Sequence, residues 1–230
     1  MPLNKSKGNM YEWITHTWNP LGGKCPHGCS YCSTNKFYYP NLIEKYSGEP
    51  RLIEKELKTN LGSDNFIFVC AQNDLFAESI PMEFIWMVNE HCKKYNNKYL
   101  FQTKNPKRLY EFYYKHGLPK QSVICTTIET DKWIPKVMKN SPYPHVRAMS
   151  MAQLKEFDRY VTIEPVMKFN LYWMVSIIKS FNPIQVNIGA DSGNSNLPEP
   201  NAKQIKELIN ELEKFTIVKQ KNNLNRLLND

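Results

Sequence analysis

The stretch CPHGCSYC, residues Cys25–Cys32, places three cysteines within eight residues in the spacing C-x3-C-x2-C. Soft thiolate ligands at this density suit iron–sulfur clusters or zinc. Three thiolates can hold three irons of a [4Fe–4S] cube and leave the fourth iron open to a small molecule. Structural zinc sites have four protein ligands, and no second close cysteine pair follows here. The spacing therefore favours a cluster, with His27 as a fourth ligand in the alternative zinc interpretation.

The strand before this stretch and the elements after it alternate regularly along the chain. Apolar runs of strand length are expected at residues 11–18, 66–70, 99–103, 123–128, 160–163, 184–188 and 216–218. Helices are expected at residues 42–60, 81–91, 105–114, 133–138, 171–181 and 202–215, and residues 146–150 fit a short strand or an irregular segment. About six or seven strand–helix units predict a parallel sheet with helices outside it. We expect a partial or irregular (β/α) barrel of about six parallel strands, with an open doubly wound sheet as the alternative.

Size and composition limit the class of protein. A chain of 230 residues with 41% hydrophobic residues is long enough for one barrel domain, which we expect to span residues 1–230. No apolar run of about 18 residues predicts a membrane span, and the N-terminus lacks an apolar signal region. Six cysteines, three of them crowded together, indicate ligation rather than disulfides. We therefore expect a cytoplasmic protein with no membrane partner.

The net charge of +8 suits a polyanionic partner such as DNA, RNA or a nucleotide. An ordinary lysine-rich surface is an equally good explanation. Residues 104–116 interleave basic and aromatic side chains, as in single-strand binding sites, although an amphipathic helix on a barrel has the same pattern. Cys70, Cys92 and Cys125 fit buried core positions better than extra ligands.

Polar residues follow the predicted strands where each strand ends. Function collects at the carboxyl ends of parallel strands in α/β folds, so we expect most of these residues to line one cavity with the cysteines. The alternative for any single residue is an N-cap of the next helix. The residues concerned are Asn73, Asp74, Lys104, Thr127, Glu129, Glu164, Asn187, Gly189 and Asp191.

The cysteine motif resembles that of the radical S-adenosylmethionine (radical SAM) superfamily, C-x3-C-x-aromatic-C, with Tyr31 as the aromatic residue. The resemblance implies a partial barrel whose first strand precedes a cluster held by Cys25, Cys29 and Cys32. It also implies that the open iron binds the amino and carboxylate groups of SAM. An electron from the cluster then cleaves SAM to a 5′-deoxyadenosyl radical. An external donor such as flavodoxin or ferredoxin supplies the electron to the cluster. Tyr31 would pack near the cluster and the SAM adenine.

Further segments are similar to those of the phage Gp37/Gp68-like family, which is also described as a domain of unknown function. They recur in the same order and span about residues 11–220. The segments are WNP (18–20), DLF (74–76), QTKNPKR (102–108), IEP (163–165), GADSG (189–193) and KQ (219–220). Relatives often have Gly-Gly-Glu-Ser-Gly where this chain has GADSG. Their Lys-Gln-Trp-Gly ending is Lys-Gln-Lys-Asn here, without the aromatic residue.

The chemistry of SAM suggests which residues at the strand ends bind it. Its sulfonium is cationic and its ribose carries two hydroxyls, and carboxylates and amides suit both, so Asn73, Asp74 and Glu164 are candidates. Gly189 would let the backbone approach adenine closely. Lys104 would pair with the SAM carboxylate or a substrate phosphate, unless it is a surface lysine at a helix start.

Three functions remain open on this sequence. The first is a radical SAM enzyme that modifies or repairs a nucleic acid base or nucleotide, in distant similarity to spore photoproduct lyase. The second is a radical SAM enzyme acting on a peptide or small metabolite. The third is a zinc-containing nucleic-acid-binding module without catalysis, which metal analysis would distinguish from the others.

Overall fold

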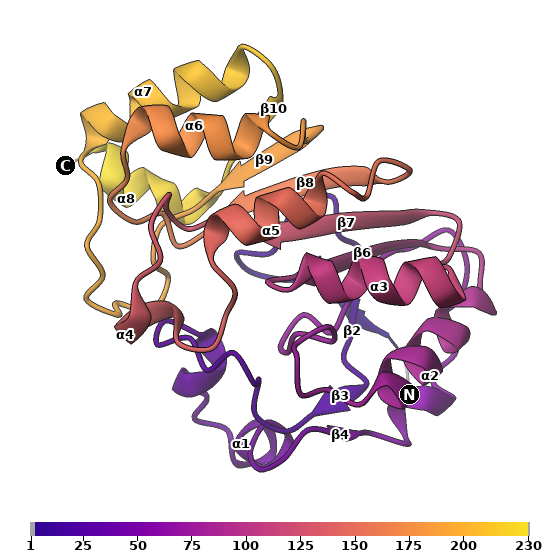
Figure 1. The fold of residues 1–230 in the computed structure, drawn as a ribbon. Coiled ribbons are helices and arrows are strands. Elements are labelled where there is room, and N and C mark those ends of the chain that lie inside the picture. The colour runs from indigo at the N-terminus through magenta and orange to yellow at the C-terminus, as the bar shows by residue number, and fades with distance from the viewer. Residues whose placement is uncertain (1–2, 230) are drawn as a thin grey trace.

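The computed structural model describes residues 3–229, and its main feature is an eight-stranded sheet (Figure 1). The spatial order is β1-β2-β5-β6-β7-β8-β9-β10, and all pairs are parallel except β1 with β2. The strands are β1 (Asn4–Lys5), β2 (His16–Trp18), β5 (Phe66–Val69), β6 (Lys98–Thr103), β7 (Ser122–Thr127), β8 (Asp158–Ile163), β9 (Gln185–Ile188) and β10 (Ile217–Gln220). From β2 onward each strand pairs with the next one in this sheet, so the order never reverses as it does in a doubly wound sheet. This confirms the predicted partial-barrel type of α/β fold.

Figure 1 shows helices covering the outer face of the sheet. They are α2 (Met82–Lys93), α3 (Pro106–His116), α5 (Pro144–Met151), α6 (Leu171–Lys179) and α7 (Ala202–Glu213). Side chains alternate across each strand, so Ile67, Phe101 and Ile124 join the large core of the helix layer. The shorter elements are η1 (Ser33–Lys36), α1 (Pro40–Lys45), η2 (Glu56–Lys58), α4 (Pro135–Met138), η3 (Asn222–Leu224), α8 (Asn225–Leu228) and the pair β3 (Leu21–Gly22) with β4 (Arg51–Leu52).

An aromatic plug fills the inner face of the sheet near the amino ends of the strands. Trp13 stacks on Tyr11 with ring centroids 5.0 Å apart and meets Phe66 and Tyr160 at 4.7 and 5.3 Å. Tyr11 also packs in a small apolar cluster with Phe68. The plug closes one end of the interior, which leaves the carboxyl ends of the strands as the place for a site.

Three predicted elements are wrong in extent or type. The predicted helix 42–60 ends at Lys45, because Gly48 takes a positive φ of 70° and Pro50 precedes a strand. Residues 146–150 are helical rather than a strand or irregular, since Pro144 opens α5 at its first turn. The first strand is only His16–Trp18, and residues 11–15 contribute to the plug. Among residues 3–229, no helix is long and apolar enough to cross a membrane.

Candidate functional site

A cavity of about 590 Å³ lies at the carboxyl ends of the strands, and we call it the cysteine cavity. All three cysteines of the motif line it. The cavity is also lined by most of the predicted SAM-binding residues, namely Tyr31, Asn73, Asp74, Lys104 and Glu164. Gly189 is not among the lining residues, although Ala190 is. The fold therefore gathers in one place side chains that are far apart in the sequence.

The cysteine loop is held by its own backbone and by the segment around α4. Gly28 adopts a φ of 61°, which favours glycine, and its N–H donates to the Cys25 carbonyl at 3.1 Å. The Ser30 N–H donates to the Val137 carbonyl at 2.9 Å, and the Asn140 N–H donates to the His27 carbonyl at 3.2 Å. These bonds fix a tight loop whose cysteines face the same cavity.

The three cysteines are free thiols in a partly dry setting. Cys29 is buried, whereas Cys25 and Cys32 are half-buried. Burial, followed by the negative charge of Asp74, raises the pKa of the Cys25 thiol to about 12. A cation such as iron favours the thiolate, so this donor set fits a cluster held by three sulfurs. Within residues 3–229, no group of three or more His, Cys, Asp or Glu side chains is gathered for a single metal ion.

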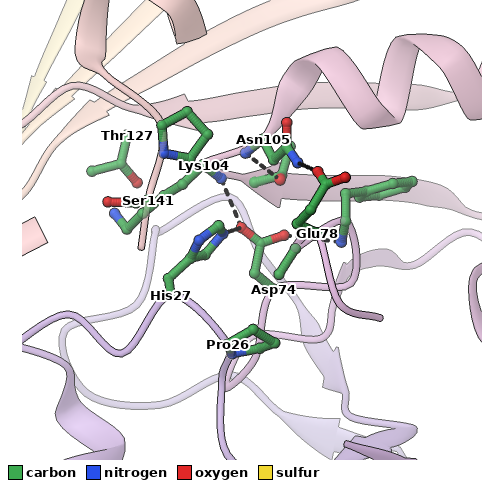
Figure 2. Close-up of polar contacts among 12 residues, drawn as sticks. Pro26, His27, Asp74, Glu78, Lys104, Asn105, Thr127 and Ser141 are labelled. Atoms are coloured by element: carbon green, nitrogen blue, oxygen red, sulfur yellow. Dashed lines mark hydrogen bonds and ion pairs between the residues drawn. The ribbon is translucent and has the colours of Figure 1, made fainter. Parts of the chain in front are cut away.

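Asp74 joins the cysteine loop to the ends of two strands. Its Oδ2 lies 2.7 Å from His27 Nε2 and accepts a hydrogen bond from the Lys104 N–H at 2.7 Å, while its Oδ1 accepts from the Phe76 N–H at 3.0 Å (Figure 2). Burial alone would raise the pKa of this carboxyl, but His27 and the hydrogen bonds it accepts hold its pKa below the usual range. Beside it, Asn73 donates to the Gly23 carbonyl at 2.9 Å. Both predicted SAM ligands thus position the loop.

A second carboxylate, Glu129, lies at the centre of a buried cluster below the loop, here called the Glu129 cluster. Arg147 Nη1 lies 2.7 Å from one carboxylate oxygen and Lys104 Nζ 3.0 Å from the other, which also accepts from the Tyr31 hydroxyl. Burial would raise the pKa of Glu129, but Arg147 and then Lys104 outweigh it and lower the pKa to about 2. The Lys104 ammonium lies 5.4 Å from the Tyr31 ring centroid. The cluster fixes Tyr31 between Cys29 and Cys32.

Glu164, directly after β8, lines the cavity at the centre of what we call the Glu164 cluster. Its carboxylate lies 2.6 Å from Lys221 Nζ and accepts hydrogen bonds from Asn9 and Asn223, each at 3.0 Å. A Cβ on Gly189 would lie 2.8 Å from Glu164 Oε1. Gly189 therefore leaves room for this carboxylate, and its own N–H and C=O already pair with backbone groups of β8 and the segment after it. The predicted contact of Gly189 with adenine stays a prediction.

One family model matches residues 9–201, and its description is Protein of unknown function (DUF5131). The chain belongs to this family. No protein with a curated description matches the DUF5131 chain. The match does not itself show the resemblance to the phage Gp37/Gp68-like family, which stays a prediction.

Solved structures of spore photoproduct lyase resemble this DUF5131 fold. Its complex with a dinucleoside spore photoproduct superposes with a TM-score of 0.58 at 10% identity, covering 92% of this chain and 78% of that chain. A variant with a cysteine replaced by alanine gives 0.60 at 9% identity, covering 94% and 80%. A variant with a tyrosine replaced by phenylalanine gives 0.60 at 8% identity with the same coverage. At these identities the likeness shows the fold.

Sequence reasoning missed several residues that organise the site of this DUF5131 protein. Arg147 is fully buried and also donates to the Thr127 carbonyl at 2.8 Å and to Ser141 Oγ at 3.0 Å. A single arginine among the apolar residues of a short helix was the available signal. The segment after β10 supplies Lys221 and Asn223 to the Glu164 cluster. Nothing in the local sequence marks them, because their partner is more than fifty residues away.

Proposed function

We propose that this DUF5131 protein is a radical SAM enzyme that modifies or repairs a nucleic acid base or nucleotide. The observation that carries the proposal is the cysteine cavity, in which Cys25, Cys29 and Cys32 lie as free thiols at the carboxyl ends of a parallel sheet. These three residues would hold a [4Fe–4S] cluster. The likeness to spore photoproduct lyase supports the same reading at the level of the fold.

The cavity has the size and the side chains for a bound cofactor. Its volume of about 590 Å³ falls within the range of small-molecule sites, roughly 300–1,000 Å³. Together with SAM, a bound cluster would supply the reductive cleavage that yields a 5′-deoxyadenosyl radical. Around that chemistry, Tyr31 is held in one orientation by Glu129. Glu164 and Lys221 line the same cavity, where their charges can orient polar groups of SAM or of the substrate.

A nucleotide substrate is supported by charge and by the related fold. Lys7 and Lys24 line the cavity and are exposed, and Lys36 lies beside them. Ammonium groups at the mouth of a cavity suit phosphates, and the net charge of +8 suits a polyanion. One structure of spore photoproduct lyase holds a dinucleoside spore photoproduct, a ligand of the same chemical class.

The test is anaerobic reconstitution with iron and sulfide, followed by dithionite and SAM. We expect 5′-deoxyadenosine to form slowly without substrate and faster with the correct one. Candidate DNA, RNA and nucleotides are added in turn, at two salt concentrations, because a polymer bound through phosphates loses affinity as salt rises. A protein that takes up stoichiometric zinc and no iron contradicts the proposal. Faster cleavage only with a peptide or an uncharged metabolite would contradict its substrate class.

A further inference from the structure

A second hollow, the outer hollow, lies beyond His27 and has a volume of about 350 Å³. Its charged lining residues besides His27 are Lys107, Lys139 and Arg147, with the single carboxylate Glu78. His27 lines both the outer hollow and the cysteine cavity. Figure 2 shows the imidazole of His27 against Asp74, with Ser141 and Asn105 from the outer side nearby. His27 is therefore shared by the outer hollow and the cysteine cavity.

Three lysines on and around α4 form what we call the lysine face, made of Lys132, Lys136 and Lys139, of which Lys139 lines the outer hollow. All three are exposed, and within residues 3–229 none of their ammonium groups has a hydrogen bond or ion pair. Residues 132–155 contain no aspartate or glutamate. The nearest acid before them, Asp131, accepts a hydrogen bond from the Asn170 N–H at 2.8 Å. The face is thus an unneutralised patch of positive charge.

The lysine face lies directly on the back of the cysteine loop. Figure 1 shows α4 beside the segment that carries the cysteines, and the Val137 carbonyl accepts the Ser30 N–H at 2.9 Å. Cys29 Sγ lies 3.8 Å from the Met138 carbonyl oxygen. Lys139 has a backbone φ of 47°, which residues other than glycine rarely adopt. Its side chain lies against the cysteine loop, because its Cδ is 3.8 Å from where a Cβ on Gly28 would be. The chain accepts this unfavourable backbone where a lysine meets the loop.

The face is also separate from the cysteine cavity. No residue between 131 and 150 lines that cavity, whose lysines are Lys7, Lys24, Lys36, Lys104 and Lys221. A partner on the lysine face therefore comes close to the cysteines and leaves the cavity open to substrate. A nucleic acid substrate needs the cavity itself, whereas an electron donor needs only a short path to the cluster.

We propose that the lysine face and the outer hollow dock an acidic protein that donates single electrons, of the reduced flavodoxin type. The proposal rests on the function proposed above, because that function consumes electrons that the chain does not supply. One electron leaves the donor, which is oxidised, and enters the cluster, which is reduced, and no bond forms or breaks in this step. Opposite charges on the two surfaces steer the encounter and set its orientation.

The test compares two charge-reversal variants of the reconstituted protein. The first carries Lys132→Glu, Lys136→Glu and Lys139→Glu. The control carries Lys203→Glu, Lys206→Glu and Lys214→Glu on α7 and at its C-cap, where exposed lysines allow the same change in net charge. Calorimetry measures the affinity for flavodoxin, and stopped-flow absorbance measures the rate of cluster reduction by reduced flavodoxin and by dithionite.

We expect the first variant to lose about tenfold to a hundredfold in affinity and in the flavodoxin rate, with a weaker salt dependence. The control should stay near the parent, and all three proteins should react equally with dithionite. Equal flavodoxin affinity and rate in all three proteins would overturn the proposal. So would a loss of oligonucleotide binding without any loss of flavodoxin binding. If the parent takes up no cluster and dithionite gives no SAM cleavage, the proposed function fails instead.

Discussion

Glu129 and Glu164 follow neighbouring strands of the same sheet, and the protein uses them in opposite ways. Glu129 is fully buried, does not line the cysteine cavity, and pairs with Arg147 and Lys104. The side chain of Glu164 is 20% exposed, lines the cavity, and pairs with Lys221. The same residue type at the same edge of the sheet supports the cysteine loop in one case and faces the cysteine cavity in the other. Position along a strand therefore does not decide the role of a carboxylate.

The difference comes from what surrounds each carboxylate. Burying an ion pair costs desolvation energy, which only close hydrogen-bonded partners offset. In the Glu129 cluster both carboxylate oxygens have such partners. The Glu164 cluster is open on the cavity side, so a ligand can exchange with its present partners. We expect changes at Glu129 to act mainly on stability and changes at Glu164 mainly on binding.

The largest expected effect on stability comes from Glu129→Gln. The substitution leaves the buried Arg147 guanidinium without its counter-charge, so we expect a loss of about 3–5 kcal/mol in the free energy of unfolding. Denaturant unfolding followed by circular dichroism measures it. The control is Glu111→Gln, whose exposed pair with Lys107 spans 3.8 Å and should contribute less than about 0.5 kcal/mol. Equal effects of the two substitutions would contradict the supporting role of Glu129.

The pH dependence of stability sharpens the same point. The pKa of Glu129 is lowered in the folded protein to about 2 from the ordinary value of 4.5. The ionised carboxylate therefore contributes fully to the free energy of unfolding above pH 4.5. This contribution, about 3 kcal/mol in total, is lost as the pH falls toward 2. The stability difference between the parent and Glu129→Gln should shrink over this range in denaturant titrations. A difference that stays constant with pH would show that the ionised carboxylate is not the cause.

Gly189→Ala tests how tightly the Glu164 carboxylate is placed. The new Cβ would lie 2.8 Å from Glu164 Oε1, so we expect a loss of about 1–3 kcal/mol. In a Glu164→Ala background the same change should cost less, because the contact with the carboxylate disappears and only the one with Asn223 Oδ1 at 3.0 Å remains. A double-mutant cycle of unfolding free energies measures this coupling. Additive effects would mean that the two residues do not contact each other as described.

Among the changes in the two clusters, Glu164→Ala should lower stability least, and its main effect should lie in binding. The pair with Lys221 is partly exposed, so the unfolding free energy should fall by less than about 2 kcal/mol. SAM affinity of the reconstituted protein, measured by calorimetry, should fall about tenfold, which corresponds to about 1.4 kcal/mol. Parent-like SAM affinity in this variant would remove Glu164 from the site.

Much of the fold could be predicted because strand and helix signals are local. The apolar runs at residues 66–70 and 123–128 became β5 and β7, and the polar residues after β5 and β8 meet at one cavity as expected. The predicted helix 42–60 failed because alternating charges also suit a loop region that Gly48 and Pro50 interrupt. Helix propensity alone does not reveal whether the charge pattern or the Gly48 and Pro50 interruption decides the local structure.

The support behind the site was harder to predict, because it depends on long-range contacts. Arg147 reaches Glu129 from a helix that the sequence did not indicate, and Lys221 reaches Glu164 across 57 residues. Asp74 lines the cavity, and its predicted contact with SAM stays a prediction; the sequence did not indicate that its oxygens join His27 to the ends of β5 and β6. Such pairings follow from the order of strands in the sheet, which composition and local spacing do not encode.

The most direct test of the central claim is the iron and sulfide content of protein reconstituted without oxygen. The account predicts about four irons and four sulfides per chain in the parent. Cys25→Ala, Cys29→Ala and Cys32→Ala should each lose them, whereas Cys92→Ala, in the core behind the sheet, should retain them. Stoichiometric zinc without iron in the parent, or equal retention of iron in the Cys29→Ala and Cys92→Ala variants, would contradict it.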